Sequence, residues 1–314
     1  MTAETSLPGW RLAGIRTTAE LKAAGKSAAE IGKLTRRGSL VRVRYGVYAR
    51  ADMASKVLSQ RDGDQLLRAA AELLAAGRSA MASHETAAVI HDLDLLSKPD
   101  RVLTLTRSPG HNRAGRPGVL VHSADLPARH VTVIYGMPVT TVARTVVDLA
   151  RTLEFRAGVA TADSALHRKL VTKAELQAVL TECSRWHWSQ RAAEAVSFAD
   201  GLSESVLESL ARVVFRDCGL PPPELQVWVG GAEAAGRVDF LWPEFRTIAE
   251  VDGRMKYSDP SRAVRQLDRD RQLRDAGYEV VHFTWQHITE NAGYVNSATR
   301  RAFERGTRAP RPAA

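Results

Sequence analysis

Three carboxylates stand inside two otherwise apolar stretches toward the C-terminal end of the chain. Asp239 lies in the stretch 237–242, and Glu250 and Asp252 lie in the stretch 246–252. An ionised carboxylate in a buried strand is costly unless it is paired or binds a metal. Carboxylate oxygens are the ligands that Mg²⁺ prefers. The sequence therefore predicts a site for Mg²⁺, with Mn²⁺ as an alternative, suited to activating water and stabilising charge on a phosphate.

The two stretches are expected to be neighbouring strands of one sheet. Side chains alternate along a strand, so Ile248, Glu250 and Asp252 share a face. If the strands pair as a hairpin, a suitable register places Asp239 beside Glu250. Two carboxylates are a sufficient protein contribution to Mg²⁺, which keeps several waters. Without a metal they would repel each other, which favours protonation of one of them.

Helices and strands that would position these carboxylates follow from periodicity and from capping residues. Ser205 and Glu208 fit a capping box at the start of an amphipathic helix. The predicted order of elements is αβββαβα, over residues 203–217, 225–229, 237–241, 246–252, 267–276, 278–283 and 285–291. Glu208 then lies in the first turn of the leading helix, either as a surface cap or as a carboxylate near the metal.

Positive charge is concentrated at the start of the chain. The net charge is +9, and residues 1–50 hold ten Lys or Arg against three Asp or Glu, which leaves +7 there. Such an excess indicates a polyanionic partner, although a solvated basic face without a partner is the alternative.

The basic region has the pattern of two short helices followed by a hairpin. Thr17 or Thr18 caps a helix that Gly25 ends, Ser27 begins a second helix through Arg37, and residues 40–48 alternate around Gly46. This order is typical of a winged helix-turn-helix, in which the second helix enters the major groove and the wing follows phosphates. The side chains expected to bind nucleic acid are Lys33, Arg36, Arg37, Arg42 and Arg44, with the two hairpin arginines on one face.

A family resemblance covers roughly residues 10–180. The run 38–48, the pairs Ser83-His84 and Ala87-Ala88, and the segments 136–140 and 144–149 resemble the AbiEi family of type IV antitoxins. This resemblance implies a DNA-binding transcriptional regulator and a separate toxin protein as partner. Inside it, His84 is expected to be a local hydrogen-bond partner.

Two further features of this region are expected to be structural. Arg144 and Asp148 stand four apart on one helix, where they can form an ion pair. Trp186 and Trp188 are expected to serve as packing anchors.

A second resemblance covers about residues 203–295. The αβββαβα order with Asp239 and the run Glu250-Val-Asp252 resembles the PD-(D/E)xK endonuclease superfamily, and within it the small Vsr-like domains. The resemblance implies that Asp239 and Glu250 are metal ligands and that Glu208 lies near the metal. The superfamily has lysine where this chain has Asp252, so Lys256 would substitute for it, or Asp252 would be a further ligand.

Three basic side chains of the same region are expected near the nucleic acid. Arg269, Arg271 and His282 would contact DNA phosphates, with solvated helix faces as the alternative for the arginines. Catalysis would then depend on Glu208, Asp239, Glu250, Asp252 and Lys256.

The expected fold is mixed α+β and α/β. It comprises a winged helix-turn-helix domain at 1–60, an α+β middle domain at 61–181, a linker at 182–202, a restriction-endonuclease-like domain at 203–300 and a disordered basic tail at 301–314. No apolar run reaches about 18 residues, and no signal peptide is evident. Two cysteines without metal-site spacing suit a cytoplasmic protein.

Two functions remain open at this point. The first is a DNA-binding protein with a Mg²⁺-dependent endonuclease domain, in a toxin–antitoxin or defence context. The alternative is an antitoxin-type regulator that binds promoter DNA or a toxin protein and whose nuclease-like domain is inactive. Enzymatic activity is therefore left undecided by the sequence, because the lysine of the motif is missing.

Overall fold

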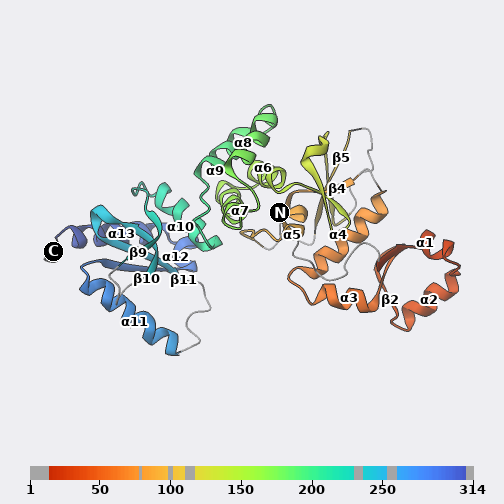
Figure 1. Ribbon diagram of the computed structural model, residues 1–314, viewed down its shortest axis with the longest axis horizontal. Helices are drawn as coiled ribbons and strands as arrows, with labels where there is room; N and C mark the ends of the chain where they lie inside the picture. The colour runs from red at the N-terminus through yellow and green to blue at the C-terminus, as the bar shows by residue number, and fades with distance from the viewer. Residues whose placement is uncertain are drawn as a thin grey trace. The chain divides into compact units, whose positions relative to one another are not determined.

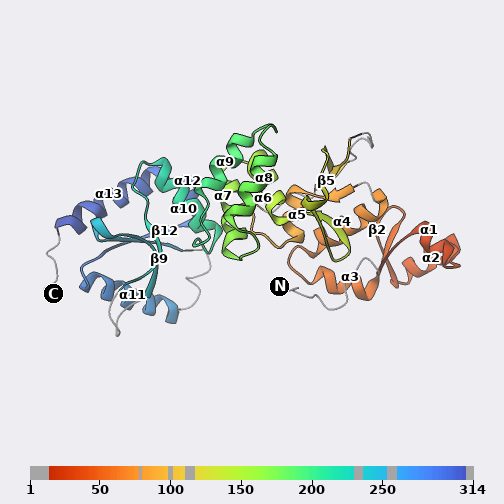
Figure 2. The same ribbon diagram turned by 45° about the horizontal axis from the view of Figure 1, so that its top comes forward.

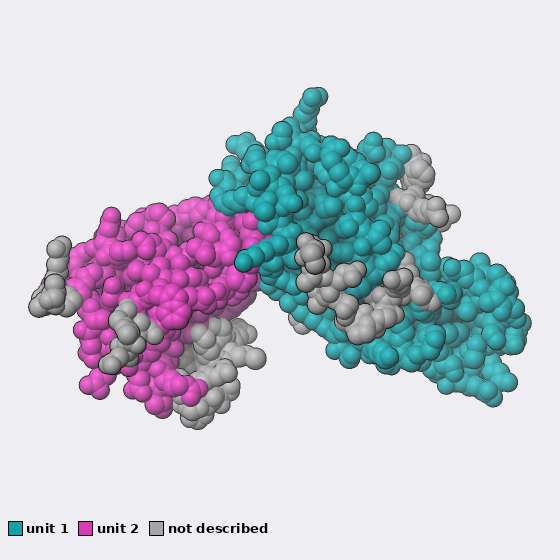
Figure 3. Space-filling view, in the orientation of Figure 1, with its two compact units in different colours: residues 1–161, 168–197 teal, residues 162–167, 198–314 magenta. Residues whose placement is uncertain are grey.

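The structure is a computed structural model that describes residues 14–77, 80–97, 102–109, 117–229, 236–252 and 260–308, with only the backbone of 260–263. The chain divides into two compact units (Figure 3). Unit 1 comprises residues 1–161 and 168–197, and unit 2 comprises residues 162–167 and 198–314. Among the described residues, no helix is long and apolar enough to cross a membrane.

Unit 1 begins with two short helices and a small antiparallel sheet, drawn in red and orange in Figure 1. Capping boxes Thr17–Glu20 and Ser27–Glu30 start the two helices, as the sequence predicted for the second. The three strands lie in the order β1-β3-β2. These elements are β1 (Ile15–Thr17), α1 (Thr18–Ala23), α2 (Ala28–Arg36), β2 (Leu40–Arg44) and β3 (Val47–Arg50).

The same hydrophobic core continues into the middle of the chain. Buried Ile15 and Val47 belong to one cluster with Leu66 and Leu67 of the long helix α4. The sheet of β1, β2 and β3 therefore shares a core with α4, and the expected boundary near residue 60 falls inside unit 1. The connecting helices are α3 (Ala51–Leu58) and α4 (Gly63–Ala76).

A five-stranded mixed sheet follows, in the order β6-β5-β4-β8-β7. Its strands are β4 (Ala80–Ala82), β5 (Leu103–Arg107), β6 (Val119–Ser123), β7 (Val131–Ile134) and β8 (Met137–Thr140). Helix α5 (His84–Ile90) packs on β5. The remaining helices are α6 (Val142–Thr152), α7 (Phe155–His167), α8 (Lys173–Glu182) and α9 (Ser189–Phe198). Helix α9 lies where a linker was expected, and its buried Ala192, Ala195 and Val196 explain why it is folded.

Unit 2 contains a four-stranded sheet in the order β12-β11-β10-β9. Strands β9 to β11 are antiparallel neighbours, whereas β12 runs parallel to β11 after the crossover helix α11. The elements are α10 (Val206–Asp217), β9 (Glu224–Val229), β10 (Gly236–Trp242), the short helix η4 (Pro243–Phe245), β11 (Thr247–Asp252), α11 (Pro260–Asp275), β12 (Glu279–Thr284), α12 (Trp285–Glu290) and α13 (Ala292–Arg308). The order expected from the sequence is therefore present, with a longer α11 and one further helix.

Helices cover both faces of this sheet, with α11 on one side and α10, α12 and α13 on the other (Figure 2). The second side is aromatic, since Phe215 of α10 meets Phe240 and Trp242 edge-on at 5.2 and 5.1 Å between ring centroids. Phe303 of α13 stacks on Phe245 at 4.1 Å. This contact explains why residues 301–308, expected to be disordered, are helical; residues 309–314 lie outside the described residues.

Candidate functional site

The candidate site begins with a row of polar side chains across the sheet of unit 2. The last pair of β10 with β11 is Phe240↔Ala249, so Asp239 and Glu250 are the next residues of the two strands, and Glu250 is in register with His282. Glu250 and His282 project from the face that α11 covers, because they contact Arg269 and Asp270 of that helix. The adjacency of Asp239 and Glu250 is the one that strand alternation predicted from the sequence.

Asp239 lies where β10 and β11 stop pairing. Its Oδ2 accepts a hydrogen bond of 3.0 Å from the backbone N–H of Val251, and the carboxylate is half-buried. The side chain thus takes a backbone donor of the neighbouring strand and stays at the open end of the strand pair.

Glu250 is 3% exposed and faces a guanidinium. Arg269 of α11 places Nη2 2.8 Å from Oε1 and donates from Nη1 to Oε2 at 3.2 Å. Oε1 lies within ion-pair distance but makes no hydrogen bond of good geometry to any described residue. Burial raises the pKa of Glu250 above its usual range, against the attraction of Arg269 and together with the repulsion of Asp239.

Arg269 is held in place by a glycine. A Cβ added at Gly236 would lie 2.5 Å from Nε of Arg269, so the guanidinium occupies space that only glycine leaves open. Its Nη2 also donates to the carbonyl of Arg237. Arg269 was expected to contact DNA phosphates; the structure directs it to Glu250, while Arg271, 82% exposed, faces solvent near Asp275.

Asp252, which stands at the position of the missing lysine, is paired with an imidazole. His282 contacts Asp252 Oδ2 through Nδ1 at 3.3 Å and Asp270 Oδ2 through Nε2 at 2.8 Å. A neutral imidazole donates from one nitrogen only, so two carboxylate partners favour the protonated ring. The hydrogen bond that His282 donates to Asp252 is the largest cause that raises the pKa of His282.

Glu208 is a buried carboxylate at the start of α10 that interacts with the charge of Asp239. It is 8% exposed and accepts hydrogen bonds from Glu204 N, Ser205 Oγ and Gln226 Nε2 at 2.9, 2.7 and 2.9 Å. Burial raises the pKa of Glu208, and the charge of Asp239 raises it further. Glu208 lies in the first turn of α10, where it caps the helix with Ser205, and it also accepts a hydrogen bond from Gln226 of β9.

The donor set is compatible with a hard divalent cation. Asp239 and Glu250 offer carboxylate oxygens, one of them buried and without a hydrogen bond, and Mg²⁺ completes its shell with waters. No group of three or more His, Cys, Asp or Glu side chains suited to a metal occurs among the described residues. Of the described residues, Asp239 and Glu250 would hold such a cation, in competition with Arg269 for Glu250. Lys256 lies outside the described residues.

Gln266 and Asp270 were not predicted as parts of this site. Gln266 Nε2 donates to Glu250 Oε2 at 3.4 Å and to Asp270 Oδ1 at 3.1 Å. The signal was present, because residues 266, 269, 270 and 273 recur at the spacing of one helix face and the last is buried Leu273. The run of charges around them hid it.

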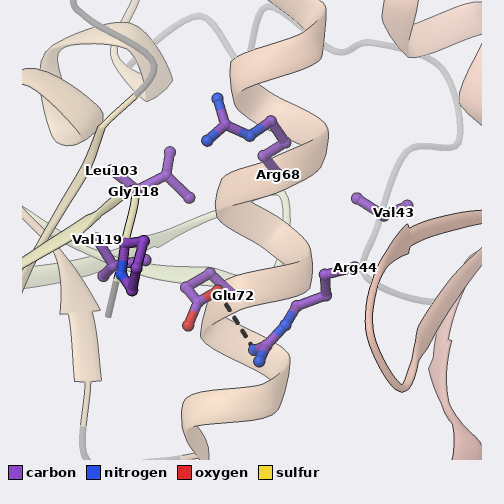
Figure 4. Close-up of a pocket in the computed structure, with 8 residues that line it drawn as sticks. Val43, Arg44, Arg68, Glu72, Leu103, Gly118 and Val119 are labelled. Carbon is purple, nitrogen blue, oxygen red and sulfur yellow. Dashed lines mark ion pairs between the residues drawn. The ribbon is translucent and has the colours of Figure 1, made fainter. Parts of the chain in front are cut away.

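The basic side chains of unit 1 divide into exposed and ion-paired ones. The side chains of Lys33, Arg36, Arg37 and Arg42 are exposed. Arg44 is half-buried and lies 3.3 Å from Glu72 of α4, where it lines a cavity of about 60 Å³ (Figure 4). A register shift between Arg42 and Arg44 separates two arginines that strict alternation would place on one face.

Two expected structural roles are confirmed in the middle of unit 1. Arg144 Nε donates to Asp148 Oδ2 at 2.7 Å, and both side chains are buried. The guanidinium of Arg144 lies 4.2 Å from the ring centroid of Trp186, which is therefore a packing anchor. Trp188, expected to be a second anchor, is instead 56% exposed.

His84 is a strained and buried residue of unit 1. Its φ of 49° is unusual for a residue other than glycine, and its ring stacks on His122 at 3.9 Å. Its Nδ1 contacts Ser83 Oγ at 3.1 Å, the local hydrogen bond expected from the sequence. Burial lowers the pKa of His84 to about 4.

The fold defines a mixed α/β protein of two units. Residues 75–197 match the AbiEi antitoxin C-terminal domain, which supports a toxin–antitoxin context. The chain belongs to the family of two uncharacterised Mycobacterium tuberculosis proteins, MT2308 (strain CDC 1551 / Oshkosh) and Rv2248 (strain ATCC 25618 / H37Rv). Each is 32% identical to it over 269 residues, covering 85% of this chain and 94% of the relative.

Among solved structures, the chain is similar to the crystal structure of the RV2827C protein from Mycobacterium tuberculosis. That similarity covers 62% of this chain and 78% of the other, with 17% sequence identity and a TM-score of 0.41.

Proposed function

We propose that this chain acts on DNA in a toxin–antitoxin context, with a metal-dependent phosphodiesterase site in unit 2. The observation that carries the proposal is that Asp239 and Glu250 follow the last pair of β10 and β11, close enough for the charge of Asp239 to raise the pKa of Glu250. The charge of Asp239 also raises the pKa of Glu208. The order of α10, three antiparallel strands, α11 and a parallel fourth strand is the arrangement expected of the PD-(D/E)xK resemblance.

Binding to duplex DNA is proposed for the N-terminal part of unit 1. Two short helices and the hairpin β2–β3 follow one another as in a winged helix-turn-helix, and α2 presents exposed Lys33 and Arg36. Exposed Arg42 on the hairpin suits a phosphate contact. Arg44 contributes by fixing the hairpin to α4 through Glu72.

The chemistry in unit 2 would combine a cation with fixed side chains. Asp239 and Glu250 would hold Mg²⁺ or Mn²⁺, which when bound supplies charge stabilisation and a more acidic water. Gln266 orients Glu250, and His282, clamped by Asp252 and Asp270, supplies positive charge in the row where the lysine of the motif is absent. Lys256 remains a proposed alternative source of that charge.

A cleavage assay tests the catalytic proposal. Supercoiled plasmid is incubated with the full chain in Mg²⁺, Mn²⁺ or EDTA. We expect nicking or cutting with a metal, lost in Asp239→Asn and in Glu250→Gln and retained in the control Glu290→Gln, whose carboxylate is exposed in the same unit. Cleavage that persists in either site variant, or is absent with every metal, contradicts the proposal.

A second function is favoured by one specific contact. Arg269 lies against both oxygens of Glu250 and compensates its charge without a metal. On this proposal unit 2 is an inactive scaffold, and the chain is an antitoxin-type regulator that binds promoter DNA or a toxin protein. Footprinting on its own promoter and co-purification with a toxin would support this function, and cleavage dependent on Glu250 would exclude it.

A further inference from the structure

One tryptophan of unit 2 lies in an unusual place. Trp228 is on β9, the outermost strand of the sheet, and it is 75% exposed. Trp242 on the neighbouring strand is by contrast 2% exposed. Single exposed apolar side chains are common, but an exposed aromatic ring beside a cation offers a face on which a base can stack.

The strand register places Trp228 next to an arginine and close to the carboxylates. Trp228 pairs directly with Arg237 of β10, so the two side chains share a face with Cβ atoms about 5 Å apart. Arg237 precedes Asp239 by two residues, which puts both on that face about 7 Å apart along the strand. Trp228, Arg237 and Asp239 therefore form a row on the sheet, in which an aromatic ring is followed by a cation and then by a carboxylate.

Arg237 keeps donors for a ligand. Its side chain is 43% exposed and its Nη2 lies 2.6 Å from Glu204 Oε2. An exposed ion pair of this type is weak and exchanges readily with other anions. The guanidinium has five N–H donors, so one contact with Glu204 leaves others for a phosphate.

The strand that carries Trp228 is fixed two residues earlier. Gln226 has a φ of 54° and donates to Glu208, so its strained backbone is held by a buried carboxylate. Pairing with β10 resumes at Val227 and continues through Trp228 to Val229. The aromatic ring is thus carried by a positioned strand end, which reduces the entropy lost on binding.

We propose that Trp228 and Arg237 bind an unpaired nucleotide of a nucleic-acid strand, with its base on the indole and its phosphate at the guanidinium. The next phosphodiester along the strand would then lie at the carboxylate pair, which is the step that rests on the proposed function. Bases in a duplex are stacked on each other and offer no free face, so the substrate class is single-stranded or locally unpaired nucleic acid.

Binding to short oligonucleotides tests this proposal in the full chain. The background carries Lys33→Ala, Arg36→Ala and Arg42→Ala, which weakens the duplex-binding surface of unit 1, and EDTA removes any metal. Labelled dT and U oligomers and a duplex are titrated by fluorescence anisotropy. Stacking one base is worth about five- to 150-fold in affinity, so Trp228→Ala should weaken single-strand binding by about tenfold or more.

Matched variants separate stacking from general effects. Trp228→Phe keeps an aromatic face and should retain most of the affinity, and Trp188→Ala, which removes a 56% exposed tryptophan of unit 1, should change nothing. If Trp228→Ala loses more affinity for the dT oligomer than for the U oligomer, the ligand is DNA; the reverse indicates RNA. The proposal is overturned if Trp228→Ala binds single strands as tightly as Trp188→Ala, or if duplex binding falls equally.

The outcome is independent of catalysis. If Trp228→Ala lowers single-strand affinity but the plasmid is never cut, nucleotide binding by Trp228 and Arg237 is supported and the phosphodiesterase proposal fails. If the plasmid is cut and Trp228→Ala binds and cuts as wild type does, only the nucleotide-binding proposal for Trp228 and Arg237 fails.

Discussion

Glu250 is the residue on which the two proposed functions divide, because its charge can be compensated by Arg269 or by a metal. Arg269→Met removes the guanidinium and leaves a carboxylate that is 3% exposed. We expect the free energy of unfolding in EDTA to fall by about 1–3 kcal/mol, the cost of a buried polar group that loses its partner. Mn²⁺ should then stabilise this variant more than wild type, since no cation has to be displaced.

Thermal unfolding with and without Mn²⁺ measures both effects. A ligand at a hundred times its dissociation constant adds about 2.7 kcal/mol, a clear shift of the midpoint. Glu250→Gln should show no Mn²⁺ effect. If Mn²⁺ shifts neither wild type nor Arg269→Met, the ion pair alone compensates Glu250 and the inactive scaffold is favoured.

His84 makes the stability of unit 1 sensitive to acid. Burial lowers its pKa from 6.5 to about 4, with further lowering by His122 and Arg151 and an opposing effect of Asp148. Because the folded pKa is below the unfolded value, the unfolded chain binds the proton first as the pH falls. The associated stability is complete above pH 6.5 and is lost progressively down to pH 4, by up to about 3 kcal/mol.

Replacement by asparagine isolates this contribution. His84→Asn keeps a residue type that tolerates positive φ and removes the titrating ring. We expect urea unfolding at pH 7 and pH 4.5 to show a smaller loss in the variant than in wild type. An equal loss in the two proteins would assign the acid sensitivity to other groups, such as His122.

At the scale of elements, the hairpin β2–β3 combines two different uses of arginine. Arg42 is exposed, whereas Arg44 is tied to Glu72 of α4. Arg42→Ala should weaken duplex binding and reduce the slope of log affinity against log salt by about one, as expected for one phosphate contact. Arg44→Ala should instead lower the stability of unit 1, because Glu72 is 6% exposed.

Salt titrations by anisotropy, together with thermal unfolding, distinguish the two arginines. Arg50→Ala is a suitable control, since Arg50 is exposed and pairs only locally with Asp52 among the contacts described for it. A reduced salt slope in Arg44→Ala with unchanged stability would show that Arg44 leaves Glu72 to bind phosphate.

The last turns of α7 are joined to α10 by a buried ion pair within unit 2. Arg212 Nη1 donates to Asp163 Oδ2 at 2.8 Å and to Ser203 Oγ at 3.3 Å, and Nη2 donates to the carbonyl of Phe198 at 2.7 Å. Breaking a buried pair from one side costs about 3–5 kcal/mol, so Arg212→Met should destabilise unit 2 by that amount. Arg216→Met, one turn away and exposed, should stay within about 0.5 kcal/mol of wild type in the same urea titration.

Asp163 shows why removal of the arginine is the more damaging change. Burial raises its pKa to about 6 even though Arg212 lowers it, so the ionised carboxylate is already at a cost. Asp163→Asn keeps a carbonyl oxygen to accept from the N–H of Asp200 and removes the buried charge. Its effect should therefore be smaller than that of Arg212→Met, and the opposite ranking would mean that the charge itself holds the helices together.

For the molecule as a whole, the features predictable from the sequence were those encoded by neighbouring residues. Ser27 and Glu30 form their capping box, Arg144 and Asp148 pair one helical turn apart, and the strand alternation put Asp239 beside Glu250 across a short connection. Partners distant in sequence carry no such periodic signal. Arg44 with Glu72, and His282 with Asp252, follow only from the way the elements pack.

The core that the N-terminal strands share with α4 could not be predicted for the same physical reason. A basic region of the right architecture at 1–60 was expected to be a domain, but Ile15 and Val47 complete a core whose other half lies in α4. The apolar pattern of a short segment predicts that its side chains are buried. It does not predict which other element they pack against. The six residues 162–167 likewise belong to unit 2 although their helix begins in unit 1.

This shared core leads to a prediction about truncation. A chain that starts at residue 51 loses Ile15 and Val47, each 1% exposed, and uncovers the faces of Leu66 and Leu67. Burying one such aliphatic side chain contributes about 1.5–3 kcal/mol, so unit 1 should lose at least about 3–6 kcal/mol, comparable to the whole stability of many domains. Unit 2 should be unaffected.

Calorimetry of the full and truncated chains measures this effect. The data are read as two transitions, because one two-state fit does not apply to two units. The variant Lys33→Ala, Arg36→Ala, Arg42→Ala serves as the control, because it removes three basic side chains but keeps the core. An unchanged unit 1 transition in the truncated chain would restore the separate domain at 1–60 and contradict the single core.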